Sequence, residues 1–430
     1  MIKAIVGGRW TTAIGLLLWA GAASAGGIPP EGAVRPPGLP PMAASLPAPY
    51  RAPYLPASDG ERLQEVPSAA DPKVPEMRSL RAKLDTEPRN LDAAVRLANS
   101  YIDYSRQIGD AHYAGYAEAV IDPWTRLAAP PPSALLAQAA ILDYRHQFDA
   151  ARELLQATLR RDARNAQAWL SLATLDMVQG RYEAARKDCA QVLSTTGSDL
   201  GSACLGNLFS YTGRARQSLV LLRQGEAAGG GTSVGYQAWI EGLIAEAAER
   251  LGDWPLAEAH YHSALRLLPH DNFLLVAYAD FLLDRGRPAE VLPLLADHFQ
   301  SDTAFLRLAL AQAALHSPDA SRYAWMMAAR FEALKQRGSD YFGREEARFA
   351  LQLQHDPETS LALAQRNWQF QRAPWDARVV LEAALAAHQP GAAAAVVTFV
   401  EETRLEDPAV QSLARQVPMP PSSGAAGESR

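Results

Sequence analysis

The sequence is poor in cysteine and lacks several of the motifs that mark metal or phosphate sites. Its 430 residues contain two cysteines, Cys189 and Cys204, and no Cys-x-x-Cys pair. A redox-active dithiol of the usual spacing is therefore excluded. Neither a His-Glu-x-x-His motif nor a Gly-Lys-Ser/Thr loop is present. We therefore expect no metal site, no cofactor and no enzymatic activity.

The chain also lacks an excess of positive charge. It has 41 lysines and arginines against 47 aspartates and glutamates, a formal net charge of −6. Such a surface repels a phosphate backbone, so we expect no nucleic-acid partner.

Long hydrophobic runs are missing from the chain after residue 25. The longest run in that part is Ala392 to Val400. The start itself carries two basic residues, a short apolar run from Ala13 to Ala20, and Ala23-Ser24-Ala25. This order predicts a secretory signal peptide over 1–25 and no transmembrane segment in the mature chain. An uncleaved anchor is the alternative. Export to the periplasm of a Gram-negative bacterium follows from the signal peptide.

Strand-type alternation is hard to find, whereas helical periodicity recurs. The clearest stretch, Ala168 to Leu193, places Trp169, Leu172 and Ala173 before a turn at Gly180 and further apolar residues after it. It predicts two amphipathic helices that must bury their faces against neighbours. Similar turns recur at Gly109, His146, Gly180, Gly213, Gly252, Gly286, Ser317, His355 and Gln389, with a mean spacing of 35 residues.

This order of Trp, Leu, a small residue, Gly, Tyr and Ala resembles the tetratricopeptide repeat, whose period is 34 residues. The resemblance covers roughly 75–410. It implies an all-α fold: an α-solenoid of about nine antiparallel helix hairpins in a right-handed superhelix.

We therefore divide the chain by composition. After the signal peptide, 26–75 is a Pro/Ala-rich leader, either a spacer or a docking segment around Pro49 to Tyr54. Repeats occupy 76–228 and 236–416. The glycine-rich step at 229–235 between them is a hinge or a surface loop, and 417–430 is a polar tail.

The two cysteines fall on helices that are consecutive in the predicted array. A disulfide between Cys189 and Cys204 agrees with export, and two buried thiols are the alternative. The nine histidines are expected in capping or surface roles. Carboxylate pairs such as Glu345-Glu346 and Glu401-Glu402 are expected on solvated faces.

The resemblance also implies a concave groove lined by the first helix of each hairpin. Carried over position by position, it assigns partner-binding roles to Asn99, Asp103, Asp143, Tyr144, Asn207, Tyr211, Trp239, Glu246, Arg250 and Asp280, with Glu249, Phe273 and Asp284 nearby. These side chains are acidic and aromatic, which favours a protein or peptide partner with basic or apolar side chains. We therefore predict a non-catalytic interaction scaffold. The alternative is an envelope polysaccharide or peptidoglycan assembly factor, in which Tyr144, Tyr211 and Trp239 stack on sugar rings.

Overall fold

The computed structural model describes residues 73–108, 110, 112–228, 233–336 and 343–418. Over these residues the secondary structure is helical, with no β-strand. The predicted signal peptide, nearly all of the leader, and most of the tail lie outside the described residues. The helices are α1 (Lys73–Thr86), α2 (Leu91–Ile108), α3 (His112–Thr125), α4 (Pro132–Tyr144), α5 (Phe148–Arg161), α6 (Ala166–Val178), α7 (Tyr182–Thr196), α8 (Ser198–Tyr211), α9 (Ala215–Ala228), α10 (Val234–Arg250), α11 (Trp254–Leu267), α12 (Asn272–Asp284), α13 (Pro288–Leu294), α14 (Asp302–Ala314), α15 (Ala320–Gln336), α16 (Gly343–Gln352), α17 (Pro357–Trp368), α18 (Pro374–Ala386), α19 (Ala394–Thr403) and α20 (Pro408–Ala414), with a short 3-10 helix, η2 (Pro390–Ala393), before α19.

The helices pair into consecutive antiparallel hairpins. In the described part of the chain nine hairpins run from α2/α3 to α18/α19, preceded by α1 and followed by α20. The predicted α-solenoid of about nine hairpins is confirmed. Alanines hold the paired helices close: Ala173 of α6 and Ala185 of α7 are fully buried in one cluster with Cys189. Small side chains at such positions let two helix axes approach closely.

The turns inside the hairpins share one backbone device. A residue in the left-handed region follows the first helix, with φ of 67° to 71° at Gly180, Gly213, Gly252 and Gly286, and 50° to 56° at His146, His316, His355 and His388. At Gly180 the amide donates to the Met177 carbonyl, and the next amide, of Arg181, donates to Asp176. This is a Schellman motif, which pairs the last carbonyls of the helix.

Histidine therefore replaces glycine at four of these turns. Histidine tolerates the left-handed region better than most residues with a side chain. The prediction that the histidines serve as caps is thus met by His146, His316, His355 and His388. Two turns lie one residue before their predicted positions, at His316 instead of Ser317 and at His388 instead of Gln389.

Several predicted boundaries change in the structure. Pro123 lies inside α3, near its C-terminal end. Residues 233–235 of the predicted hinge belong to α10 and its cap, because the Ser233 side chain accepts the amide of Tyr236; residues 229–232 lie outside the described residues. Val417, placed in the polar tail, is 5% exposed and packs on the C-terminal core.

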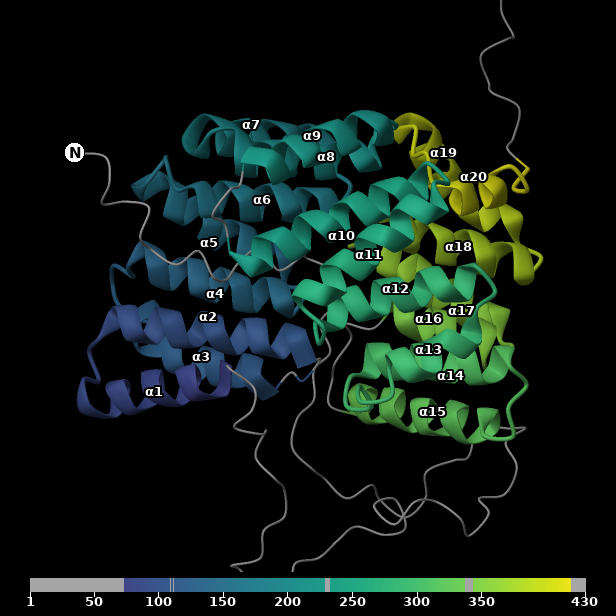
Figure 1. Cartoon of the computed structure of the whole chain (residues 1–430), viewed down its shortest axis with the longest axis horizontal. Helices are drawn as coiled ribbons and strands as arrows, with labels where there is room; N and C mark the ends of the chain where they lie inside the picture. Colours follow the sequence, from purple (N-terminus) through teal and green to yellow (C-terminus); the bar gives the residue numbers. More distant parts are fainter. Residues whose placement is uncertain (1–72, 109, 111, 229–232, 337–342, 419–430) are drawn as a thin grey trace, which may run out of the picture.

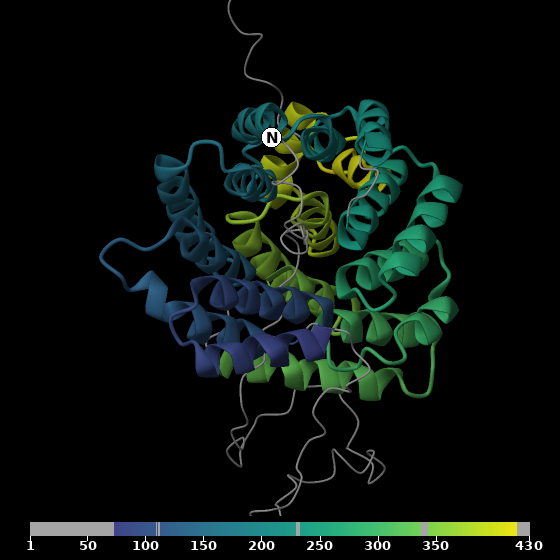
Figure 2. The ribbon, with the colours of Figure 1, turned by 60° about the vertical axis from the view of Figure 1, so that its left-hand side comes forward.

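The hairpins curl round so that the end of the array meets its earlier part. Figure 1 shows α16 to α20 behind and beside α8 to α12. Figure 2 shows these C-terminal helices, coloured light green to yellow, inside the curve formed by the earlier helices. In the described residues no helix is both long enough and apolar enough to cross a membrane.

Candidate functional site

The C-terminal hairpins pack against the turns of earlier hairpins. The Arg372 amide donates a hydrogen bond to the carbonyl of Val178, at 2.7 Å, at the end of α6. The amide of Ala215, at the start of α9, donates to Oε2 of Glu406 at 2.6 Å. These contacts join positions about 190 residues apart, so the inner side of the solenoid is partly filled by the chain itself.

Two turn glycines make this approach possible. A Cβ at Gly180 would lie 2.9 Å from the ring of Phe399, and one at Gly213 would lie 2.6 Å from the carbonyl oxygen of Arg404. A Cβ contact below 3.0 Å is sterically excluded without movement of the backbone or the neighbour. These glycines therefore serve both the turn and the packing of the C-terminal hairpins.

Many residues that the resemblance assigned to an open groove are buried in the structure. Asn207, Tyr211 and Trp239 are 4%, 6% and 7% exposed, and Tyr144 is 4% exposed. The rings of Tyr144, Tyr211 and Trp239 are therefore not available for stacking on a sugar. The glycan-binding alternative loses the aromatic faces on which it depends.

A second group of predicted residues lies apart, on α2 and α4. Arg106 donates to Oδ2 of Asp143 at 3.3 Å and lies 4.0 Å from Asp103. Burial raises the pKa of Asp143 to about 7 and that of Asp103 to about 6, against the pull of Arg106. Asn99 is partly exposed on the same helix as Asp103.

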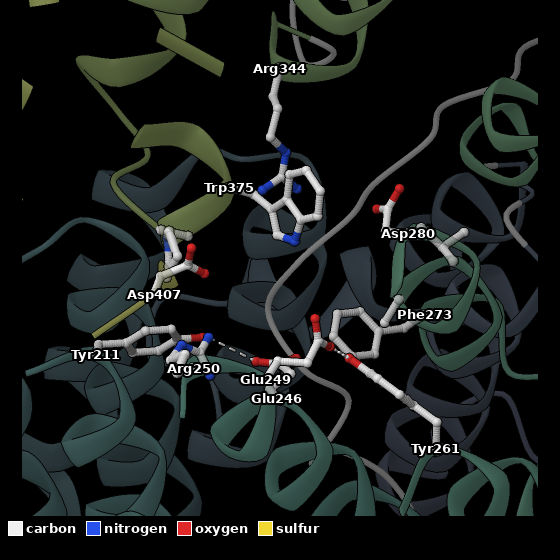
Figure 3. A pocket seen from close by; sticks show the side chains of 14 residues that line it. Tyr211, Glu246, Glu249, Arg250, Tyr261, Phe273, Asp280, Arg344, Trp375 and Asp407 are labelled. Atoms are coloured by element: carbon white, nitrogen blue, oxygen red, sulfur yellow. Dashed lines mark hydrogen bonds and ion pairs between the residues drawn. The ribbon is translucent and has the colours of Figure 1, made fainter. Parts of the chain in front are cut away.

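The remaining predicted residues meet at a cavity that we call the inner cleft. It lies between α10 and α12 on one side and the starts of α18 and α20 on the other, and has two connected parts of about 70 Å³ and 280 Å³. Figure 3 shows the smaller part, whose labelled residues are Tyr211, Glu246, Glu249, Arg250, Tyr261, Phe273, Asp280, Arg344, Trp375 and Asp407. The larger part continues along Trp254, Asp284, Arg285, Arg378 and Pro408.

Arg250 is held in place on the wall formed by α10. Its guanidinium donates to Ser210 at 2.5 Å and to Glu246 at 3.2 Å, and lies 4.7 Å from the centroid of the Tyr211 ring. The charge of Glu246 is thus balanced within its own wall.

Glu249 and Asp407 carry the carboxyl groups of the cleft that have no arginine partner. The Tyr261 hydroxyl donates to Glu249, while Asp407 accepts the Val410 amide at 2.9 Å as the N-cap of α20. Burial raises the pKa of Glu249 to about 8, although the Tyr261 hydrogen bond opposes the shift. Among the described residues, neither carboxyl group forms an ion pair.

Trp375 lies on the opposite wall, and two arginines pack against its ring. The guanidinium groups of Arg348 and Arg378 lie 4.7 Å and 4.4 Å from its ring centroid. Arg378 also donates to both oxygens of Asp284, at 2.5 Å and 2.9 Å. Trp375 is therefore fixed in orientation, with part of its surface facing the cleft.

Behind the cleft lies a buried ionic network. Arg307, on α14, is 1% exposed and donates to both oxygens of Asp280, at 3.0 Å and 2.6 Å. Arg307 also pairs with Glu345, and Arg348 donates to Asp280 at 3.0 Å. Burial alone raises the pKa of the Asp280 carboxyl, but the two arginines outweigh it and hold the pKa at about 2.

This network corrects the prediction for α16. Glu345 was expected on a solvated face, yet it is 3% exposed, and its neighbours Arg344 and Arg348 are 6% and 4% exposed. The isolated sequence shows only a charged helix, and no signal within it places the partners on α12 and α14. By contrast, Glu401 and Glu402 lie exposed on α19, as predicted.

Cys189 and Cys204 are joined by a disulfide in the structure. The bond links α7 to α8, with the Cα atoms 5.5 Å apart and both side chains fully buried. It fastens two consecutive hairpins beside the core that supports Tyr211 and Trp239.

The described residues show neither a serine nucleophile elbow nor a metal-binding cluster. Residues 231–235 have the spacing Gly-x-Ser-x-Gly, but the Ser233 hydroxyl caps α10 and no strand precedes it in the described residues. A nucleophile elbow requires a strand-to-helix turn. The described residues also contain no group of three or more histidine, cysteine or acidic side chains placed to hold a metal ion.

Comparison with known proteins gives a family match for part of the chain. A family model described as a tetratricopeptide repeat matches residues 145–199. No curated protein matches the chain. Among solved structures, a chain of the APC/C hetero-tetramer Cut9-Hcn1 shares 13% identity with a TM-score of 0.42, over 81% of this chain and 60% of that one. Yeast Tom70 shares 9% identity with a TM-score of 0.38, over 80% of this chain and 85% of that one.

A tetratricopeptide repeat protein from Parabacteroides merdae shares 10% identity with a TM-score of 0.35, over 72% of this chain and 98% of that one. At this level the structural similarities carry no argument about function. The family match lies within the second and third of nine consecutive helical hairpins. It shows a tetratricopeptide-repeat pattern in this segment of the chain.

Proposed function

We propose that the chain is an exported, non-catalytic scaffold that holds a protein partner, and that the inner cleft receives a basic side chain of that partner. One observation carries this proposal: Glu249 and Asp407 face the same cavity, and neither is paired with an arginine. Tetratricopeptide repeats stack into curved arrays that commonly serve protein recognition. In this chain the C-terminal hairpins fill part of the inner side of the solenoid. The partner therefore binds at the inner cleft, which stays open.

The size and walls of the cleft fit a side chain better than a folded element. Its two parts measure about 70 Å³ and 280 Å³, and Phe273 and Trp375 supply apolar surface beside the carboxyl groups. A lysine or arginine packs its methylene stem against such rings while its charged end reaches a carboxylate. A basic group beside Glu249 lowers the pKa of that carboxyl, so binding releases a proton near neutral pH.

Export is supported by the signal-type order of the first 25 residues and by the disulfide between Cys189 and Cys204. Disulfides persist in oxidising compartments. Cell fractionation followed by alkylation with and without reductant tests this part. The periplasmic protein should gain two alkyl groups only after reduction, whereas a cytoplasmic protein with two free thiols would refute export.

The binding surface is tested by photocrosslinking in the complete protein. A photoreactive group replaces Phe273, on the cleft wall, and in a matched control replaces Glu402, which is exposed on α19. Crosslinking is carried out in the native envelope fraction. We expect one dominant protein to be crosslinked from position 273 and to be absent from position 402.

The charge is tested by Glu249→Gln, which keeps an acceptor for Tyr261 and removes the ionisable group. Binding of the crosslinked partner should weaken roughly tenfold at pH 9, where the wild-type carboxyl is ionised, and change little at pH 6. Crosslinking to glycan alone, or equal crosslinking from positions 273 and 402, would overturn the cleft as the binding surface.

A further inference from the structure

A cluster of tyrosines lies at the N-terminal end of the solenoid, among residues that do not line the inner cleft. Tyr101 of α2 and Tyr113 and Tyr116 of α3 have ring centroids 5.7 Å to 5.9 Å apart. Tyr104 packs edge-on against Tyr113 at 4.7 Å. We call Tyr101, Tyr113 and Tyr116 the tyrosine surface.

Part of this surface faces solvent. The Tyr116 side chain is 54% exposed, and a Cβ added at neighbouring Gly115 would meet nothing within 4 Å. Tyr104, by contrast, is 2% exposed and anchors the cluster to the core. The buried ring of Tyr104 thus holds the ring of Tyr113 in place. The surface beside Tyr116 and Gly115 is open to solvent.

Adjacent phenol rings of this kind suit a proline-rich segment. A proline ring packs flat on an aromatic face, and the extended polyproline II backbone leaves its carbonyls free to accept hydrogen bonds from tyrosine hydroxyls. The segment is already extended before it binds, so little conformational entropy is lost.

We propose that the tyrosine surface binds the chain's own segment Pro47–Pro56. This segment reads Pro-Ala-Pro-Tyr-Arg-Ala-Pro-Tyr-Leu-Pro. With three residues per turn of polyproline II, Pro47, Tyr50, Pro53 and Pro56 share one side and form a stripe of rings, whereas Arg51 lies off that stripe.

The point where the chain enters the fold supports this occupant. The first helix, α1, begins at Lys73, and its residues Val74 and Met77 belong to the same apolar cluster as Tyr104, with Tyr101 and Tyr113 packed against it. The segment therefore joins the fold next to the surface that we assign to it.

The length of the connection also suits binding within one chain. Sixteen residues lie between Pro56 and Lys73, which gives a root-mean-square span of roughly 20 to 25 Å for a flexible chain. A tether of this length produces an effective concentration on the order of millimolar. Even an intrinsic dissociation constant of about 0.1 mM would thus keep most of the segment bound. This inference is independent of the inner cleft.

The test is photocrosslinking within the complete mature chain. Tyr116 is replaced by p-benzoyl-phenylalanine, and the matched control carries the same group at Val220, a 57% exposed residue of α9. After irradiation of the dilute purified protein, proteolysis and mass spectrometry locate the crosslinked residues. We expect crosslinks from position 116 to fall within 47–56, at a yield at least fivefold above that from position 220.

A second variant, Pro53→Ser with Pro56→Ser, changes only the segment and leaves the helical fold untouched. It should lower the yield from position 116 at least fivefold. Two results would overturn the proposal: a yield from position 116 equal to that from position 220, or crosslinks that join isotopically heavy to light chains in a mixed sample. The second result would assign the surface to another copy of the chain.

Discussion

Removal of one charge from the buried ionic network should destabilise the fold more than any exposed charge change. The substitution Asp280→Asn keeps the shape of the side chain and removes its charge. Arg307, at 1% exposure, then loses its two-point carboxylate partner, and Arg348 loses its hydrogen bond of 3.0 Å. Two buried guanidinium groups are left with Glu345 as the nearest carboxylate.

The expected magnitude follows from two estimates. A pKa held at about 2, against an ordinary value of 3.8, corresponds to about 2 kcal/mol of stability. Breaking a buried ion pair by removing one partner costs about 3 to 5 kcal/mol. We therefore expect Asp280→Asn to lower the free energy of unfolding by about 3 kcal/mol. Because the pKa is depressed, the wild-type contribution is complete above pH 3.8 and is lost as the pH falls towards 2.

Hydrogen exchange is the suitable assay, because a repeat array can unfold in parts and a single unfolding midpoint then averages over them. Exchange should accelerate in peptides that cover α12, α14 and α16, whose residues form the network. Peptides from α4 to α7 should keep their wild-type rates. Urea unfolding followed by circular dichroism provides the matching free energy.

The control is Glu183→Gln in the exposed pair with Arg186, whose side chains are 83% and 54% exposed. Exposed pairs contribute less than about 1 kcal/mol. If Asp280→Asn cost no more than Glu183→Gln, or if exchange accelerated equally throughout the chain, the argument that this network fastens α16 to α12 and α14 would be refuted.

Three further predictions concern the turns, the disulfide and the cleft. His316→Gly should stabilise the protein by about 0.5 kcal/mol and Gly286→Ala should destabilise it by about 1 kcal/mol, as measured by urea unfolding, because both residues have positive φ. A Cβ at Gly286 would meet no neighbour within 4 Å, so the backbone conformation alone sets that cost. Changes of the same sign would contradict this. Cys189→Ala combined with Cys204→Ala should cost about 3 kcal/mol for a separation of 15 residues, and an unchanged midpoint would argue against the bond. Stability should fall as the pH rises from 5 to 9, and Glu249 should contribute about 4 kcal/mol of this fall, since burial raises its pKa to about 8. Glu249→Gln should remove that part of the decline; an equally steep decline in the variant would show that Glu249 does not contribute to it.

The sequence predicted the helical hairpins well, because each one is specified by nearby residues. The glycines at 180, 213, 252 and 286 mark turns that require positive φ, and the structure places each of them there. The alanines within each helix likewise follow a helical spacing that is set by contact with the other helix of the same hairpin. The histidine turns were located within one residue, since histidine marks such a turn less strongly than glycine does.

The candidate site was predicted only in part. Tyr211, Glu246, Arg250 and Asp280 do lie together at the inner cleft, because consecutive first helices face the same side. Trp375 and Asp407, which complete the cleft, lie 95 or more residues further along the chain. Nothing in the repeat pattern predicts that the array curls far enough to bring them there.

The sequence by itself determined the repeat, the hairpin turns and the pairing of each helix with its neighbour, because these depend on backbone conformation and packing over about 34 residues. Only the tertiary structure decided which of the inward-facing residues stay accessible. The small rotation between successive hairpins accumulates along the array. That sum carries Arg372 to Val178 and Glu406 to Ala215, which fills part of the inner side of the solenoid and leaves the inner cleft.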